Sequence, residues 1–317
     1  RISSSIMATP AQRTNTWTLD QWYAQAVAGT QGSYVGAFAG LWTAGSNSDG
    51  ALGLNDLTQR SSPTQMGSGT DWKDFKMIRN FGDTNDFNMV IKDNNTLWGW
   101  GSGGDGVLGQ NQGPSSRYSS PVQIPGTWGS VAYGHQGVVG TKTNGTLWTW
   151  GNNFAGQLGG NFGPPSGVYN RSSPIQVGTN TTWDSGENKV NGGDYFFHAI
   201  KTDGTLWGWG ENGWGNLGLN ENAPYNQGRS SPVQVGTDTD WSTLARGLRY
   251  DGAAIKTDNT LWVWGNNGEG QLGLNHRNRR SSPTQLPGEW RYFSGGGDSA
   301  GGGKTDGTLW GCGRNHH

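Results

Sequence analysis

The chain holds few residues of the types that commonly carry catalysis or bind metals. Apart from the terminal pair, its five histidines show no metal-ligand spacing to a second histidine or to a cysteine: His135, His198, His276, His316 and His317. The single cysteine, Cys312, excludes an intrachain disulfide framework and is expected to be a buried packing residue. We therefore expect no catalytic site, no bound metal and no cofactor, and we do not expect an enzyme.

One lysine motif imitates a phosphate-binding loop. Gly303-Lys304-Thr305 has the right ending, but the glycines before it lack the spacing that cradles a phosphate. The same Lys-Thr pair recurs at three other places, which indicates a repeated strand end: Lys142, Lys201 and Lys256. Acidic residues such as Asp83, Asp86 and Asp194 follow no calcium-loop pattern, so they are expected to be solvated loop acids.

Arginine recurs just before the sequence Ser-Ser-Pro, which suggests either an anion site or a structural tie. The residues are Arg60, Arg171, Arg229 and Arg280, with Arg117 one position further away. Because the arginine returns at one place in successive repeats, its five donors are expected to bond carbonyl groups of a neighbouring repeat. Anion binding is the alternative.

Composition and charge argue against nucleic acids and membranes as partners. Lys and Arg number 22 against 23 Asp and Glu, and the net charge of −1 gives no global field for a polyanion or an anionic membrane surface. No apolar run approaches the about 20 residues that a membrane span needs. We expect a soluble protein that binds neither nucleic acid nor membrane, with residues 1–317 forming one domain.

The elements that must position any site come from an internal repeat, which shows first in the tryptophans. Leu-Trp recurs six times, with tryptophans at 42, 98, 148, 207, 262 and 310, and four copies continue as Leu-Trp-x-Trp-Gly. A Gly-x-Leu-Gly loop, a connector ending in Ser-Ser-Pro-x-Gln and one more tryptophan follow each of the first five copies. At the N-terminus, Thr9-Pro10-Ala11-Gln12 imitates the connector's end and Trp17 follows.

Each repeat reads as one four-stranded antiparallel blade. Asn144-Gly145, Asp203-Gly204 and Asp306-Gly307 are two-residue hairpin signals before Leu-Trp, and the proline belongs at an outer edge or strand start. Single blades bury little, so they must stack radially and close a ring. The prediction is an all-β propeller of six blades, with seven possible, whose repeats run over about 9–62, 63–120, 121–173, 174–231, 232–282 and 283–317.

The repeat resembles a known family. Leu261 to Gly273 is similar to the consensus of the regulator-of-chromosome-condensation repeat, and the likeness extends from about Thr9 to Asn315. That family usually forms seven blades, against the six counted here. The resemblance implies nucleotide exchange on a small GTPase and chromatin binding, but the chain shows neither the basic tail nor the protruding wedge loop that this would need.

Function is expected in the segments that differ between repeats. Three enlarged connectors, at 110–118, 160–170 and 219–228, offer aromatic side chains with apolar area for a partner: Tyr118, Phe162, Tyr169 and Tyr225. The irregular N-terminal stretch from Trp17 to Ala28 is a candidate attachment helix, with Trp22 and Tyr23 as candidate contacts. We expect these loops to cluster on one face.

Three classes of function remain open. The opening Thr9 to Trp17, followed by Gln21-Trp22-Tyr23, is similar to proteins with this repeat from tailed phages of marine bacteria, which favours a virion component that binds other virion proteins. A cellular protein-binding or glycan-binding propeller of unknown compartment is the alternative, and a guanine-nucleotide exchange factor is a third. All three are binding functions.

Overall fold

The computed structural model describes residues 40–78, 86–113, 116–161, 170–221 and 228–315. Among these residues the regular structure is almost entirely antiparallel strand, with one 3-10 turn, η2 (Gly104–Gly106). Thr9, Pro10, Trp17, Trp22 and Tyr23 lie outside the described residues, as does the predicted ring closure at the N-terminal segment.

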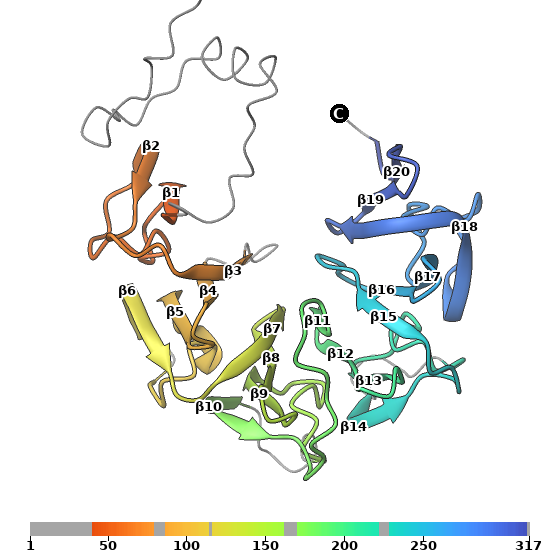
Figure 1. The fold of residues 1–317 in the computed structure, drawn as a ribbon, viewed down its shortest axis with the longest axis horizontal. Helices are drawn as coiled ribbons and strands as arrows, with labels where there is room; N and C mark the ends of the chain where they lie inside the picture. The colour runs from red at the N-terminus through yellow and green to blue at the C-terminus, as the bar shows by residue number, and fades with distance from the viewer. Residues whose placement is uncertain (1–39, 79–85, 114–115, 162–169, 222–227, 316–317) are drawn as a thin grey trace, which may run out of the picture. The chain divides into compact units, whose positions relative to one another are not determined.

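The strands form six successive blades (Figure 1). Blade I has β1 (Trp42–Gly45) and β2 (Arg60–Gln65). Blade II has β3 (Trp72–Ile78), β4 (Phe87–Lys92), β5 (Leu97–Ser102) and β6 (Arg117–Ile124). Blade III has β7 (Trp128–Gly134), β8 (Gly137–Lys142), β9 (Leu147–Asn152) and β10 (Asn170–Gln176).

The second half of the chain continues the pattern. Blade IV has β11 (Val190–Gly193), β12 (Phe196–Ile200), β13 (Leu206–Gly210) and β14 (Arg229–Gln234). Blade V has β15 (Trp241–Leu244), β16 (Asp251–Lys256), β17 (Thr260–Gly265) and the first half of β18 (Arg280–Gly295). The second half of β18, with β19 (Ser299–Lys304) and β20 (Leu309–Gly313), forms blade VI.

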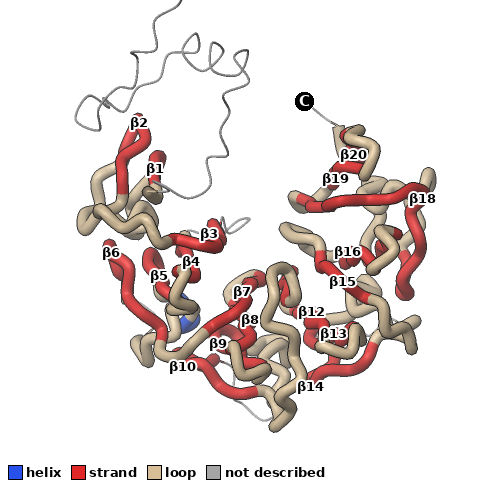
Figure 2. The backbone as a smooth tube through the Cα atoms, viewed as in Figure 1, coloured by secondary structure: helices blue, strands red, loops and turns tan. Residues whose placement is uncertain are grey.

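The all-β class and the six-bladed propeller are therefore confirmed. A blade starts at the tryptophan strand and ends after Ser-Ser-Pro-x-Gln, so Pro121 and Pro174 lie inside strands and not at blade boundaries. Figure 2 shows the strands joined by loops at their ends in each blade.

The hairpin turns before Leu-Trp are built by a short chain of side-chain hydrogen bonds. In blade III, Thr146 Oγ1 donates to Asn144 Oδ1 at 2.7 Å, and Trp148 Nε1 donates to Thr146 Oγ1 at 2.8 Å. The same chain occurs in four more blades, at Asn94, Asp203, Asp258 and Asp306. A local Asx turn therefore fixes the start of the Leu-Trp strand in these five blades.

A lysine packs between two indoles in five blades. Lys142 Nζ lies 3.6 Å from the ring centroid of Trp148 and 5.1 Å from that of Trp128. The equivalent lysines are Lys92, Lys201, Lys256 and Lys304. The recurring lysine is a cation–π clamp at the strand end and not part of a phosphate loop, which agrees with the sequence interpretation.

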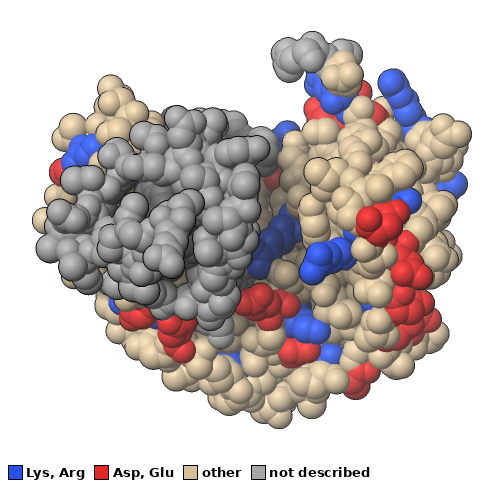
Figure 3. All heavy atoms as spheres, turned by 45° about the horizontal axis from the view of Figure 1, so that its top comes forward, with Lys and Arg blue, Asp and Glu red and all other residues tan. Residues whose placement is uncertain are grey.

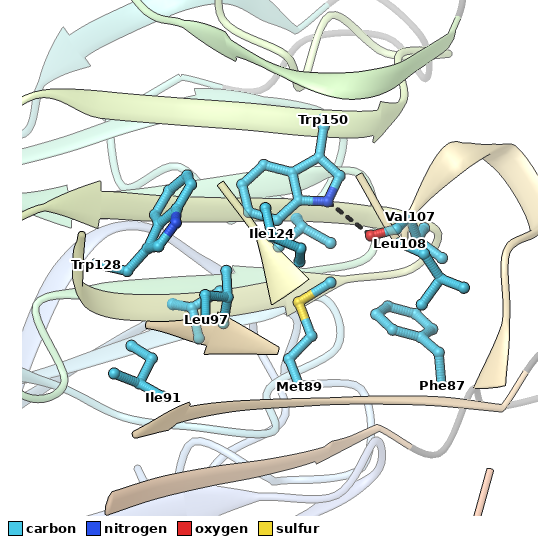
Figure 4. Close-up of a cluster of buried hydrophobic side chains, with 11 residues drawn as sticks. Phe87, Met89, Ile91, Leu97, Val107, Leu108, Ile124, Trp128 and Trp150 are labelled. Atoms are coloured by element: carbon cyan, nitrogen blue, oxygen red, sulfur yellow. Dashed lines mark hydrogen bonds between the residues drawn. The ribbon is translucent and has the colours of Figure 1, made fainter. Parts of the chain in front are cut away.

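Two repeated hydrogen bonds join each of blades II to V to the blade before it. Trp150 Nε1 donates at 2.6 Å to the Val107 carbonyl, in the Gly-x-Leu-Gly loop of blade II (Figure 4). Trp100, Trp209 and Trp264 make the same bond to Ala51, Gln157 and Asn216, and all four indoles are fully buried. In addition, the N–H groups of Asn55, Asn111, Asn161 and Asn220 donate to the first serine carbonyl of the next blade's Ser-Ser-Pro.

The hydrophobic core lies between successive blades. Around Trp150 and Trp128, side chains from blades II and III meet, among them Met89, Leu97 and Ile124 (Figure 4). Trp128 and Trp150 pack edge to face, with ring centroids 5.4 Å apart. The tryptophans thus form the scaffold, and they hold the loops at the strand ends in fixed positions.

Candidate interaction surface

Strand order places two kinds of loop at the same end of each blade. The turn between the first and second strands and the connector between the third and fourth strands both emerge there, because neighbouring strands are antiparallel. We call this end the connector face; in blade IV it holds Asp194-Tyr195 and the connector from Glu211. The opposite end holds the Asx turns described above.

Hydrogen bonds with an asparagine side chain fix the backbone at the start of the connectors. In blade III, the side-chain oxygen of Asn153 accepts the Leu158 N–H at 3.0 Å, which closes the Gly-x-Leu-Gly loop. Asn47, Asn212 and Asn267 make the equivalent bond in blades I, IV and V. Gly151 sits before this loop at φ 96°, and a Cβ there would lie 2.5 Å from the Gln136 carbonyl oxygen, so only glycine fits.

The structure places one of the predicted contact residues and leaves the others outside. Tyr118 was expected in an enlarged connector, but it belongs to strand β6, where it pairs with Gly101 and packs half-buried against the blade II–III core. The ladder resumes beyond a bulge and extends the strand to Arg117, which shortens the connector. Phe162, Tyr169 and Tyr225 lie outside the described residues.

The connector face instead shows two aromatic pairs that bridge blade joints. Phe154 of blade III and Tyr195 of blade IV have ring centroids 5.8 Å apart, and Phe154 is 40% exposed. Trp214 of blade IV and Tyr250 of blade V are likewise 5.8 Å apart. Of these four residues, only Trp214 has a signal in the sequence, because it falls outside the repeated tryptophan positions. The pairing itself depends on how neighbouring blades meet.

Charged groups surround these aromatic pairs. Arg249 Nε lies 2.9 Å from Asp194 Oδ2, across the joint between blades IV and V. Burial raises the pKa of the Glu211 carboxyl, which accepts the Gly213 N–H. Burial also raises the pKa of Asp251, at the start of β16, to about 7. In the described part of the view in Figure 3, Lys and Arg side chains lie interspersed with Asp and Glu side chains.

The recurring arginines act differently from the sequence prediction in three blades. Arg117 bonds the Ser48 carbonyl of the preceding blade at 3.2 Å, as expected. Arg60 and Arg229 instead bond Asp56 and Glu221 of their own connectors, and Arg280 approaches His276. Each of these connectors supplies a carboxylate or an imidazole to its arginine, and a charged acceptor makes a stronger hydrogen bond than a carbonyl.

Two open grooves lie at joints between blades. One, of about 590 Å³, is lined by Leu54, Met66 and Trp72 among others; the other, of about 340 Å³, repeats it around Leu219 and Val233. The Trp72 ring is covered by Lys92, 4.3 Å from its centroid. A sugar-stacking platform needs a free aromatic face, and Lys92 occupies one face of this indole.

Within the described parts of the chain, no group of three histidine, cysteine, aspartate or glutamate side chains could hold a metal ion. No described helix is long and apolar enough to cross a membrane. Cys312 is partly buried, its Sγ 3.1 Å from the Gln271 carbonyl oxygen, and burial raises the pKa of the thiol. Such a thiol packs and is poorly disposed to react.

Comparison with known proteins identifies the repeat. Residues 258–300 match the family described as the Regulator of chromosome condensation (RCC1) repeat. The chain is an RCC1-type repeat propeller. Its fold is shared by Prp20p from Saccharomyces cerevisiae, with a TM-score of 0.67 and 18% identity over 87% of this chain and 68% of that one. Human WBSCR16 gives a TM-score of 0.64 at 20% identity, over 82% of this propeller and 66% of that chain.

A curated relative covers only part of the propeller. The Ultraviolet-B receptor UVR8 of Arabidopsis thaliana is 32% identical over 97 residues, which is 30% of this chain and 21% of the receptor. The chain thus spans about a fifth of that relative and about two thirds of the two solved structures. These likenesses establish the fold and the repeat.

Proposed function

We propose that this RCC1-type propeller is a non-enzymatic protein-binding module, and that it serves as a capsid or tail component of a phage virion. The observation that carries the binding function is the pair of aromatic contacts on the connector face, where Phe154 leaves 40% of its surface exposed beside polar and charged loops. Rigid aromatic area with a polar rim is the composition of protein interfaces. Support for the virion role comes from the N-terminal resemblance and the uniform repeats.

The location of the binding residues is part of the proposal. Partners would contact the connector face, at Phe154 and the loops that hold Phe162, Tyr169 and Tyr225, with Trp22 and Tyr23 as a separate attachment. Tyr118 would contribute through the edge of β6, because its ring already packs against the core.

A cellular protein-binding propeller is the second candidate, because a specific comparison favours it. Prp20p has been characterised for its binding to Gsp1p and histones, and a crystal structure shows Kap60 bound to it. Nucleotide exchange would follow if this chain bound a small GTPase in a similar way, and an exchange assay on such a GTPase tests it.

Two experiments test the proposal. Mass spectrometry of gradient-purified particles, compared with the particle-free supernatant, should find the protein enriched in particles; its absence from them would remove the virion role. A photo-crosslinking residue at Phe154 should capture a protein partner, while the same residue at exposed Thr143, at the opposite strand ends, should not. Equal capture at both positions would contradict a connector-face interface.

A further inference from the structure

The connector of blade V carries an unusual concentration of positive charge. Residues 276–280 read His-Arg-Asn-Arg-Arg, with three arginines and no acid in five positions of a chain whose net charge is −1. The equivalent connector of blade I has the same length from Gly-x-Leu-Gly to Ser-Ser-Pro, so the two can be compared position by position. The proposed protein-binding function does not account for this loop.

In blade I, a carboxylate organises the connector. Asp56 Oδ1 accepts the Thr58 N–H at 2.9 Å and the Asn47 side-chain amide at 3.1 Å, and Asp56 Oδ2 accepts from Arg60 at 2.5 Å. The Thr58 N–H and Arg60 hold the pKa of Asp56 below its usual value. Every donor that converges on this position therefore meets a negatively charged acceptor.

In blade V, His276 occupies the position of Asp56 and meets the same donors. Its Nδ1 lies 3.2 Å from the Asn278 N–H nitrogen, and its Nε2 lies 2.9 Å from Arg280 Nη2. A neutral imidazole has one N–H and one lone pair, so it can accept at only one of its two nitrogens. One donor at this position is left facing another donor.

The arginines of this connector have no counter-ion within the described part of the chain. Among the described residues, none of Arg277, Arg279 and Arg280 has a carboxylate oxygen within 4.0 Å, whereas Arg60 and Arg229 each have one. Arg279 lies over the Trp214 ring at 5.1 Å, and its Nη1 donates to the Gly213 carbonyl at 3.2 Å, which holds it at the connector face. Arg277 and Arg279 are both exposed.

We propose that the blade V connector binds a carboxylate side chain from an acidic segment of a partner protein. The carboxylate would lie beside Arg280 and His276 and supply the acceptor that Asp56 supplies within blade I. A carboxylate is favoured over a phosphate because the matching arginines of blades I and IV bond carboxylates, Asp56 and Glu221. The inference rests on the proposed protein-binding function and adds the chemical class of the partner.

The test uses the full chain and a fluorescent six-residue glutamate peptide as the probe. Binding is expected to weaken roughly tenfold in Arg280→Gln and in the double variant Arg277→Gln/Arg279→Gln, since each removes charge-assisted donors. His276→Asp should have the same effect while raising Tm, because it restores an internal carboxylate. Arg60→Gln is the matched control, and it should leave peptide binding unchanged.

Several results would overturn the inference. These are no peptide binding by the unaltered chain at low salt, undiminished binding by His276→Asp, or an equal loss in Arg60→Gln. Inorganic phosphate or a thymidine oligonucleotide that competes more strongly than the peptide would assign the loop to phosphate. Crosslinking at Phe154 is independent of this connector, so failure here can be distinguished from failure of the proposed function.

Discussion

Two buried ionisable residues affect stability in opposite directions as pH changes. His198 is fully buried in β12, and burial lowers its pKa from 6.5 to about 4. Asp251 is 2% exposed, and burial raises its pKa from 3.8 to about 7. As pH falls from about 6.5 to 4, His198 binds a proton in the unfolded chain but not in the folded protein, so the free energy of unfolding decreases. Over nearly the same range folded Asp251 binds a proton that the unfolded form lacks, so stability is gained.

Because the two effects have opposite signs, removing either residue should expose the pH dependence of stability that the other produces. In Asp251→Asn only the histidine effect remains, so the free energy of unfolding should rise between pH 4 and pH 6.5. At pH 8 the variant should exceed the parent by up to about 4 kcal/mol, because the asparagine carries no charge that burial penalises. Asn keeps the acceptor for the Tyr250 N–H. In His198→Met, which copies Met89 of blade II, stability should fall from pH 4 to pH 7. Urea unfolding at several pH values checks both slopes, and parallel profiles in all three proteins would contradict the assignment.

Sequence analysis could not foresee these two residues because their surroundings decide their chemistry. His198 and Met89 hold the same strand position in blades IV and II, and Asp251 holds that of Phe87. The repeat indicates which strand positions are buried, but a polar residue at such a position resembles a loop residue in the sequence. Only the structure shows that the neighbouring blade covers it. The blade V connector is similar: its arginines are plain in the sequence, whereas their missing carboxylate is visible only beside Asp56.

At the scale of the strand, the two tryptophans of Leu-Trp-x-Trp-Gly have different roles. The second indole donates a hydrogen bond to the preceding blade, and the first donates one within its own blade. Trp150 Nε1 donates to Val107 of blade II, whereas Trp148 Nε1 donates to Thr146 of its own turn. Trp150→Phe leaves the buried Val107 carbonyl without its donor and should cost about 2–4 kcal/mol in unfolding free energy, counting the lost bond and area. Trp148→Phe makes the same chemical change at a partly exposed ring and should cost about half as much. Denaturant midpoints measure both, and equal losses would contradict the joint-forming role of Trp150.

Element boundaries were predictable where turn chemistry marks them and unpredictable where pairing continues past a bulge. The Asn-Gly and Asp-Gly turns lie where the hairpins form, because each turn is fixed by residues within it. Tyr118 was misplaced because the register shift between Gly99 and Gly101 lets β6 start before Ser-Ser-Pro. The predicted arginine contacts were also wrong in three blades. The partner of each arginine depends on which acidic residue or histidine its own connector contains.

At the scale of the whole molecule, a repeated joint predicts nearly additive stability, with the weakest joint limiting it. Among the described joints, the one between blades V and VI differs, because Cys312 replaces the buried tryptophan that joins the other blades. Its Sγ reaches the Gln271 carbonyl at 3.1 Å, but it fills much less space than an indole. The third strand of blade VI, β20, pairs among the described strands with β19 alone, whereas the third strands β5, β9, β13 and β17 have a partner on each side. Leu309 of β20 is 78% exposed, and the equivalent Leu97, Leu147, Leu206 and Leu261 are fully buried.

Blade VI should therefore open before its neighbours, and a change at Cys312 should show it. Amide hydrogen exchange is expected to be faster in β19 and β20 than in β8 and β9, because blade VI lacks the buried indole that joins blade III to blade II. Cys312→Trp would add the indole donor opposite the Gln271 carbonyl and roughly 1–3 kcal/mol of buried aromatic area, and it should slow exchange in β19 and β20 while leaving β8 and β9 unchanged. Cys312→Ser, which keeps the small side chain, should give no slowing. If the tryptophan variant exchanges as fast as the parent, the joint is already packed, and the weakness of blade VI lies in the edge of β20 alone.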